Sequence, residues 1–246
     1  MLFGKLSIDV YLIRRNKTFF STHDNPSLLA NKYNDFFTSI GETTAMKIYS
    51  IALERNLQAD PVASTQVAQS DNSDAFFFHP ATTSEVENVI RSFSSNKSPG
   101  YDKISSCVLK DCLPSTFTTI TQLMNNSFNT NTFTKAWKIA EVIPVLKSDY
   151  NIDINDPNNG RPISLLPVLF KISQRLAHSQ FTDYLTTNKK LVETQSGNRK
   201  LHSTETALLH VIDELLKAMD EKNISILVLL DMSNAFDSIN HNILLH

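Results

Sequence analysis

A run of large apolar residues from Ile224 to Leu230 places the strongest constraint on how this chain folds. Only Ser225 interrupts the run, and Asp231 ends it. A short run rich in Val, Ile and Leu without polar alternation is typical of a strand buried on both faces. A carboxylate at the end of such a strand must be paired, hydrogen-bonded or bound to a cation. Two interpretations of Asp231 remain open at this point, a cap of the following turn or a metal ligand.

Composition limits the class of protein. The 246 residues can form one large domain or two small ones, and a hydrophobic content of 41% is sufficient for a core. No apolar run is long enough to span a bilayer, and Asp9 interrupts the apolar N-terminus in a way that a signal peptide would not. Cys107 and Cys112 are expected to be buried free thiols in a helix, which favours a reducing compartment. We therefore expect an intracellular protein, in the nucleus or the cytoplasm, without zinc.

Charge is distributed unevenly along the chain. The net charge is -2, but residues 91–200 contain 14 Lys and Arg against 8 Asp and Glu. The segments on either side are acidic. A basic middle region between acidic flanks favours a local site for a polyanion, although uneven charge is common in proteins.

The first part of the chain divides into a helical region and a linker. Asn25 and Pro26 form a helix start, with Asn as the cap and Pro in the first turn. Apolar residues at helical spacing predict a helix to about Arg55, with a possible interruption at Gly41. Residues 60–75 contain few large apolar side chains and predict a flexible linker. We therefore expect an N-terminal helical region over residues 1–59.

Residues 76–222 predict a mostly helical domain with one pair of strands. A capping box opens a helix at Thr82, and a Pro-Gly turn at residues 96–100 ends it. Two further helices, around Val108 and Ile120, precede a strand from Trp137 to Lys147. A polar loop leads to a returning strand at residues 160–167, and helices over about 167–186 and from 203 follow. The predicted fold class is α+β.

Five blocks in this order resemble the reverse transcriptase of non-LTR, LINE-type and jockey-like retrotransposons. The resemblance covers residues 76–246, and an earlier segment, 29–41, is similar to the region that these proteins place between endonuclease and polymerase. The blocks are Asn96–Asp102, Val142–Lys147, Arg161–Leu166, Gln195–Gly197 with Ser203 and Thr204, and Leu230–Asp237.

The resemblance implies nucleotidyl transfer with two Mg²⁺ ions. A primer 3′-hydroxyl attacks the α-phosphate of a nucleotide, and the metals stabilise the attacking and leaving oxygens. It assigns Asp231 as the first catalytic, metal-binding carboxylate, with the backbone carbonyl of Met232 beside it. Phe236 occupies the position of the aromatic residue that screens the sugar 2′ position.

The resemblance also implies the binding residues and partners. Lys147 and Arg161 correspond to the finger cations that meet the triphosphate, and Arg199 and Lys200 to contacts with the template. The expected partners are an RNA template, a DNA primer and deoxynucleoside triphosphates, with no membrane and no obligate protein partner. The implied fold is a polymerase right hand, with fingers over residues 76–222 and the first palm strand and turn over 223–246.

Four departures from the family pattern bear on activity. Gly160 and Asn198 replace aromatic residues, and Gln174 replaces a frequent Glu. The second metal motif of the family, an aromatic residue followed by x-Asp-Asp, is missing, and the chain contains no Asp-Asp pair. We therefore expect an incomplete palm, weak or absent Mg²⁺ binding and no catalysis by the isolated chain. Two alternatives are a non-catalytic nucleic-acid-binding module and a non-functional remnant of a retroelement.

Overall fold

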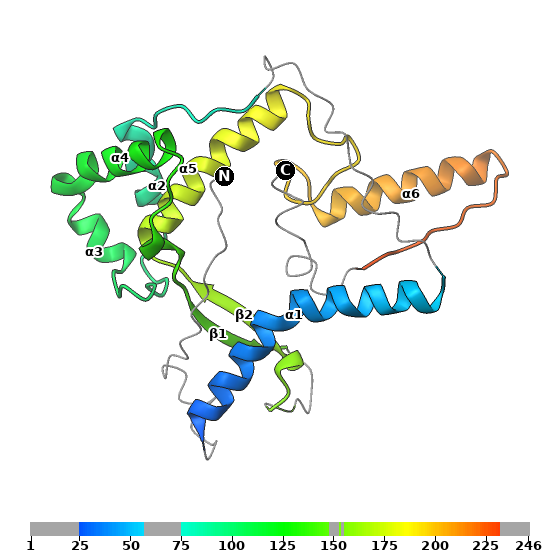
Figure 1. Cartoon of the computed structure of the whole chain (residues 1–246). Helices are drawn as coiled ribbons and strands as arrows, with labels where there is room; N and C mark the ends of the chain where they lie inside the picture. The colour runs from blue at the N-terminus through cyan, green and yellow to red at the C-terminus, as the bar shows by residue number, and fades with distance from the viewer. Residues whose placement is uncertain (1–24, 57–74, 148–152, 154, 232–246) are drawn as a thin grey trace. The chain divides into compact units, whose positions relative to one another are not determined.

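The computed structural model describes residues 25–56, 75–147, 153 and 155–231 (Figure 1). The described residues divide into two compact units, one up to Gln180 and one from Phe181 to Asp231. In chain order the elements are α1 (Pro26–Glu54), α2 (Thr83–Ser92), α3 (Ser106–Asp111), α4 (Leu113–Asn129), a 3₁₀ turn (Lys135–Lys138), β1 (Glu141–Leu146), a second 3₁₀ turn (Pro157–Asn159), β2 (Gly160–Leu165), α5 (Val168–Thr187) and α6 (Thr204–Asp220). The predicted α+β class is confirmed at this level, as a helix-rich chain with a small antiparallel sheet.

Helix α1 begins where the sequence predicts. The Asn25 side chain accepts a hydrogen bond from the Leu28 backbone N–H at 3.2 Å, and Pro26 occupies the first turn. The helix continues without interruption through Gly41 to Glu54. Its buried residues are Leu29, Tyr33 and Ile40, which lie on one face. The predicted helical N-terminal region therefore forms one long helix over its described residues.

The extended segment after the linker is held by two amide side chains. Asn125 of α4 accepts from the Ala81 N–H at 2.7 Å and donates to the Ala81 carbonyl at 2.9 Å. Gln180 of α5 makes the same paired contacts with His79, at 3.1 and 3.0 Å. Each amide thus satisfies one backbone donor and one backbone acceptor, as a neighbouring strand would. These contacts fix the chain at the entry to α2.

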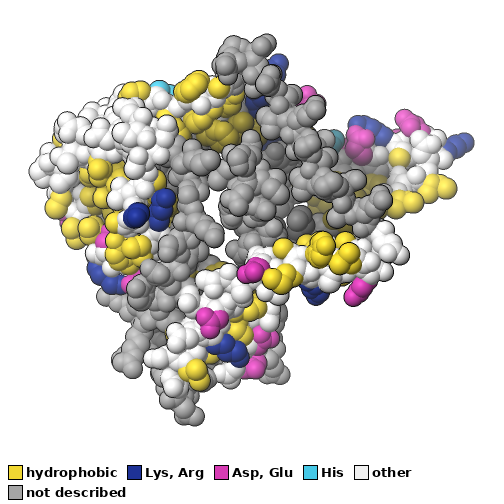
Figure 2. Space-filling view, viewed as in Figure 1, with side chains coloured by type: hydrophobic (Ala, Val, Ile, Leu, Met, Phe, Trp, Pro, Cys, Tyr) yellow, Lys and Arg dark blue, Asp and Glu magenta, His cyan; other side chains and the backbone are white. Residues whose placement is uncertain are grey.

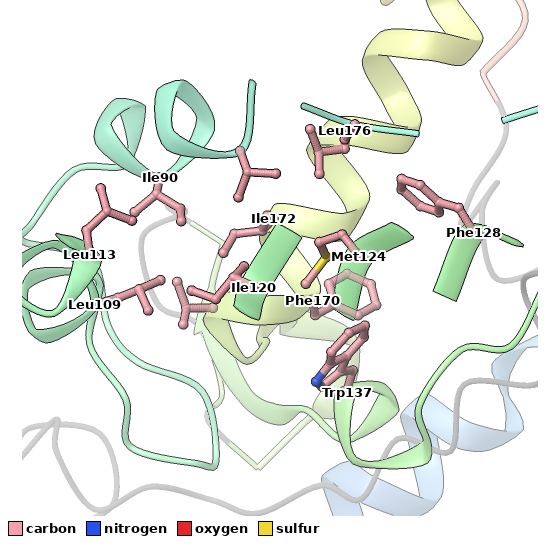
Figure 3. Close-up of a cluster of buried hydrophobic side chains, with 13 residues drawn as sticks. Ile90, Leu109, Leu113, Ile120, Met124, Phe128, Trp137, Phe170, Ile172 and Leu176 are labelled. Atoms are coloured by element: carbon pink, nitrogen blue, oxygen red, sulfur yellow. The ribbon is translucent and has the colours of Figure 1, made fainter. Parts of the chain in front are cut away.

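The core of the first unit lies between α2, α4 and α5. Figure 3 shows side chains from these helices and Trp137 converging on one cluster. Val86, Ile90, Met124 and Ile172 have no exposed surface. Burial of each such side chain contributes roughly 1.5–3 kcal/mol. The full cluster contains Ala81, Val86, Ile90, Leu109, Leu113, Ile120, Met124, Phe128, Trp137, Val168, Phe170, Ile172 and Leu176.

Strands β1 and β2 form an antiparallel hairpin. Glu141 pairs with Leu165, Ile143 with Ile163, and Val145 with Arg161. The hydrogen bond from the Lys147 N–H to the Asn159 carbonyl, at 2.9 Å, extends the pairing beyond the strands. The two strands that the sequence predicts are therefore present, but β1 begins at Glu141. Trp137 lies in the preceding 3₁₀ turn, where its ring packs at 5.5 Å between centroids against Phe133.

Two predictions about burial are wrong. Cys107 and Cys112 are exposed, because the face of α3 that packs into the core is occupied by Ser106 and Leu109. The run from Ile224 to Leu230 has no regular secondary structure, and Ile224 is 95% exposed. A strand buried on both faces needs neighbouring strands, and the sheet in the described residues consists of β1 and β2 alone. The strand predicted over residues 224–230 is therefore not formed.

Among the described residues, no helix is long and apolar enough to cross a membrane.

Hydrophobic side chains are exposed along the second half of α1, where yellow atoms follow the helix in Figure 2. They include Met46, Ile48, Tyr49 and Leu53, each more than half exposed.

Candidate functional site

The hairpin brings Lys147 and Arg161 to the same face. Arg161 is directly opposite Val145, and Lys147 follows Val145 by two residues. Directly opposed residues share a face, and alternate residues of a strand point to the same side. The two cations are therefore diagonal neighbours, with Cα atoms roughly 7–8 Å apart. Both side chains are exposed, so the face presents two positive charges to a ligand.

A carboxylate lies near this cationic face. The pKa of Asp156 lies below its usual range, mainly because the Asn158 side chain and backbone N–H donate to it, with smaller effects of Lys32 and Lys147. The Asn158 contacts measure 2.9 and 3.0 Å. Asp156 therefore stays ionised. Its negative charge offsets part of the positive charge of Lys147.

On the opposite face of the hairpin, α1 packs beside Gly160. A Cβ atom added to Gly160 would lie 2.7 Å from the Tyr33 ring, so the ring occupies the space of a side chain at that position. Tyr33 has no exposed surface, and burial is the main reason that its pKa is raised, with Asp156 and Asp153 adding to the effect. Lys32 donates to the Asn155 carbonyl at 2.5 Å and ties α1 to the loop before β2. A residue from the N-terminal helix thus fills the place where the family pattern has an aromatic residue.

The two predicted template residues lie in the second unit. The Arg199 guanidinium donates to the carbonyls of Val192, Glu193 and Gln195 at 3.1, 3.0 and 3.3 Å. These hydrogen bonds hold together the turn that precedes Arg199. Within this turn, Asn198 adopts a left-handed backbone conformation with a φ of 56°. Lys200 is exposed.

Asp231 lies in the same unit, at the end of the exposed apolar run. It is exposed, and Met232 and Phe236 lie outside the described residues. Within the ranges that the structure describes, no three His, Cys, Asp or Glu side chains are placed to hold a metal ion. A Mg²⁺ site needs oxygen ligands at near-octahedral geometry, usually from more than one group. The described residues therefore do not fit the two-metal site that the resemblance implies.

Sequence reasoning did not identify two contacts that position the hairpin. Lys103, in the turn before α3, forms an ion pair with Glu141, whose side chain is only 8% exposed. The second carboxylate oxygen of Glu141 is buried without a hydrogen-bond partner. The second contact is at Gly100, whose absent Cβ would lie 2.4 Å from the Pro167 backbone nitrogen. The segment from Gly100 to Lys103 thus contacts the open end of the hairpin, where β1 begins and β2 ends, and no sequence signal marks either contact.

Known proteins that are similar to this chain include one family and several curated relatives. The family described as reverse transcriptase (RNA-dependent DNA polymerase) matches residues 145–246, which include Lys147, Arg161 and Asp231. The chain is 30% identical over 163 residues to the probable RNA-directed DNA polymerase from transposon BS of Drosophila melanogaster. It is 30% identical over 165 residues to the RNA-directed DNA polymerase from mobile element jockey, and 31% over 162 residues to the probable enzyme from transposon X-element, both of Drosophila melanogaster.

These matches cover 66–67% of this chain but only 18% of each relative. The region of similarity is thus a small part of much longer polymerases. Its agreement with the motifs around Lys147, Arg161 and Asp231 nonetheless places the chain in the reverse transcriptase family of non-LTR, jockey-like retrotransposons.

Proposed function

We propose that this chain forms part of an RNA-directed DNA polymerase and that its hairpin binds the triphosphate of an incoming deoxynucleotide. The observation that carries the proposal is the shared exposed face of Lys147 and Arg161. On the opposite face Tyr33 packs beside Gly160, next to Arg161, so a ligand reaches the two cations from the exposed face that they share. The names of the relatives support the choice of nucleotide as the anion.

The two cations have different tasks in this proposal. Arg161 presents a planar fork that can bridge two phosphate oxygens, and its place within β2 fixes the direction of approach. Lys147 acts as a point charge on a flexible stem at the mouth of the loop. Together they offset the charge of the triphosphate and hold it in one orientation, while Asp156 offsets part of the positive charge of Lys147.

The remaining family assignments are proposals of the same kind. Residues 76–222 correspond to the fingers of a right-hand polymerase, and 223–246 to the start of the palm. Asp231 with the Met232 carbonyl corresponds to a Mg²⁺ ligand pair, and Phe236 to the residue that screens the 2′ position. RNA template, DNA primer and deoxynucleotide are the proposed partners, with Lys200 and Arg199 near the template. We assign no catalytic step to Mg²⁺, because the described residues do not fit its site.

We infer that the chain by itself binds nucleotide without catalysing extension. Asp231 is exposed, and the described residues contain no group of three metal-ligating side chains with which it could position two ions. The test is primer extension on an RNA template with Mg²⁺ by the purified chain. No product is expected from the chain or from Asp231→Asn, and extension that Asp231→Asn abolishes would contradict the inference. A non-functional remnant is distinguished by the lack of a cooperative unfolding transition in urea.

Replacing Arg161 tests the hairpin directly. Arg161→Ala should weaken binding of a deoxynucleoside triphosphate roughly tenfold or more, and Arg161→Lys roughly threefold, because lysine keeps the charge but loses the fork. Fluorescence titration with a labelled nucleotide measures the dissociation constants. Arg55→Ala, at the exposed end of α1, is the matched control and should leave them unchanged. Equal affinities for Arg161→Ala and Arg55→Ala would remove the basis of the proposal.

A further inference from the structure

A second cationic site lies in the first unit, between the Pro-Gly turn and α5. A cavity of about 750 Å³ opens between the end of α2, the turn that follows it, the start of α3 and the face of α5. This volume lies within the range of roughly 300–1,000 Å³ that is usual for ligand pockets. The lining residues are Ser92, Phe93, Ser94, Lys97, Ser98, Pro99, Ile104, Ser106, Leu165, Val168, Lys171, Gln174, Arg175 and His178.

One face of α5 supplies the polar wall. Lys171, Gln174, Arg175 and His178 are spaced by three and four residues, so they lie above one another on the helix surface. Lys97 adds a third permanent cation from the turn. No Asp or Glu is among the residues that line the cavity. The cavity therefore has a positive potential that its own lining does not neutralise.

The cations are held in place by neighbouring groups. The Arg175 guanidinium donates to the Ser92 hydroxyl at 2.8 Å, and its carbon lies 5.3 Å from the centre of the Phe93 ring. The Lys171 ammonium lies 3.5 Å from the Ser98 carbonyl oxygen. An arginine that is already stacked and hydrogen-bonded loses little conformational freedom when it binds a ligand.

Burial makes an anion favourable in this cavity. The pKa of Lys171 is lowered mainly by burial, which disfavours the charged ammonium, and Asp102 opposes this effect from outside the lining. A bound anion would restore part of the lost solvation of Lys171. The hydroxyl groups of Ser94 and Ser98 can add hydrogen bonds to anionic oxygens, whereas the Ser92 hydroxyl already donates to the Val89 carbonyl.

The cavity also suits an apolar ligand surface. Pro99, Ile104, Leu165 and Val168 line it together with the Phe93 ring. A free phosphate ion would leave this apolar surface and most of the volume unused. A nucleotide unit combines a phosphodiester with a sugar and a flat base that packs on apolar and aromatic side chains. Its chemistry therefore matches both walls of the cavity.

We propose that this cavity binds one nucleotide unit of a single-stranded nucleic acid, at a site distinct from the triphosphate-binding face of the hairpin. The phosphodiester lies against Lys97, Lys171 and Arg175, and the sugar and base lie toward Phe93 and the apolar wall. The proposal assigns a strand-binding role to Lys171 and Arg175, which lie outside the five blocks of the resemblance, and to Lys97, which lies within the first block. It rests on the cavity itself and stands or falls separately from the triphosphate proposal.

Gln174 makes the polar wall of the cavity more positive than a glutamate at the same position would. The family pattern often has Glu at this position, and the neutral side chain here leaves Lys171 and Arg175 without an adjacent carboxylate in the lining. Gln174→Glu has nearly the same shape and adds one negative charge at the polar wall. It therefore changes the electrostatics of the cavity with little effect on its packing.

The test is binding of a fluorescent single-stranded oligoribonucleotide to the full chain. Gln174→Glu should weaken binding roughly tenfold, because an added charge at short range repels the phosphodiester in a partly buried site. Lys97→Ala should weaken binding and reduce the salt slope by about 0.7, as for one lost phosphate contact. The matched controls are Gln122→Glu on the exposed side of α4 and Lys135→Ala in the 3₁₀ turn, both outside the cavity. Neither control should change the affinity.

Competition and crosslinking experiments distinguish a nucleic acid from free phosphate or free nucleotide as the ligand of the cavity. A single-stranded oligodeoxynucleotide should compete with the RNA probe, whereas inorganic phosphate and a free nucleoside triphosphate should not compete at equal concentration. Photocrosslinking from a 4-thiouridine in the probe should map to peptides containing Phe93 or residues 171–178. Equal affinities for Gln174→Glu and Gln122→Glu, or competition by inorganic phosphate alone, would overturn the proposal. A loss of nucleotide binding by Arg161→Ala with unchanged RNA binding would support the separation of the two sites.

Discussion

Replacing Gly100 with alanine should lower the free energy of unfolding by about 2–4 kcal/mol, because overpacking against backbone cannot be relieved by a rotamer change. The added Cβ would lie 2.4 Å from the Pro167 nitrogen and 2.6 Å from the Leu166 carbonyl carbon. Both atoms belong to the junction between β2 and α5, which is fixed by the hairpin on one side and the core on the other. Urea unfolding followed by circular dichroism measures the change.

The control for Gly100 is Gly197→Ala. A Cβ at Gly197 meets nothing within 4 Å, and no glycine in the described residues has a positive φ. Its substitution should leave stability unchanged or raise it by up to about 1 kcal/mol through the unfolded state. Equal stabilities of the two variants would mean that the Pro-Gly turn is not packed against the β2–α5 junction.

Replacing Lys103 with methionine should cost about 2 kcal/mol of stability, because it leaves the buried carboxylate of Glu141 without its cation. The loss is smaller than for a fully buried pair, since the Lys103 side chain is 62% exposed. The second carboxylate oxygen of Glu141 already lacks a hydrogen-bond partner. No hydrogen bond at that oxygen therefore compensates for the loss of Lys103. Methionine preserves the length of the stem, which limits the change to the charge and its hydrogen bond.

A double-mutant cycle completes this test. Glu141→Gln in the Lys103→Met background should recover much of the lost stability, because a neutral amide is less costly to bury than a carboxylate. The control is Lys217→Met, which removes a surface pair with Glu214 at 2.8 Å and should change stability by less than about 1 kcal/mol. If Lys103→Met is as mild as Lys217→Met, the pair does not anchor β1.

Local sequence signals predicted the helices and the hairpin well. Asn25 and Thr82 cap the helices that they precede, since a short polar side chain satisfies free N–H groups of the first turn. The helix predicted around Ile120 corresponds to α4, and Ile120 is buried in the core. The resemblance to reverse transcriptases assigned Lys147 and Arg161 to one ligand, and the register of the hairpin then determines that they share a face.

Contacts between distant segments could not be predicted in this way. The ring of Tyr33 fills the space beside Gly160 across more than a hundred residues of sequence, and no local pattern encodes such a contact. The cysteines are exposed because Ser106 and Leu109 occupy the inner face of α3. The run at Ile224 has the composition of a buried strand, but burial requires neighbouring strands and not composition alone. The cavity at Lys171 was missed although its four α5 residues follow helical spacing.

Phosphorus NMR of a deoxynucleoside triphosphate in Mg²⁺-free buffer tests the central claim most directly. The full chain should shift or broaden the β- and γ-phosphate resonances, because Lys147 and Arg161 bind these groups from one exposed face of the hairpin. With the double variant Lys147→Ala/Arg161→Ala, the phosphorus spectrum should remain that of the free nucleotide. The same perturbation with the double variant would contradict the assignment of the hairpin as the triphosphate site.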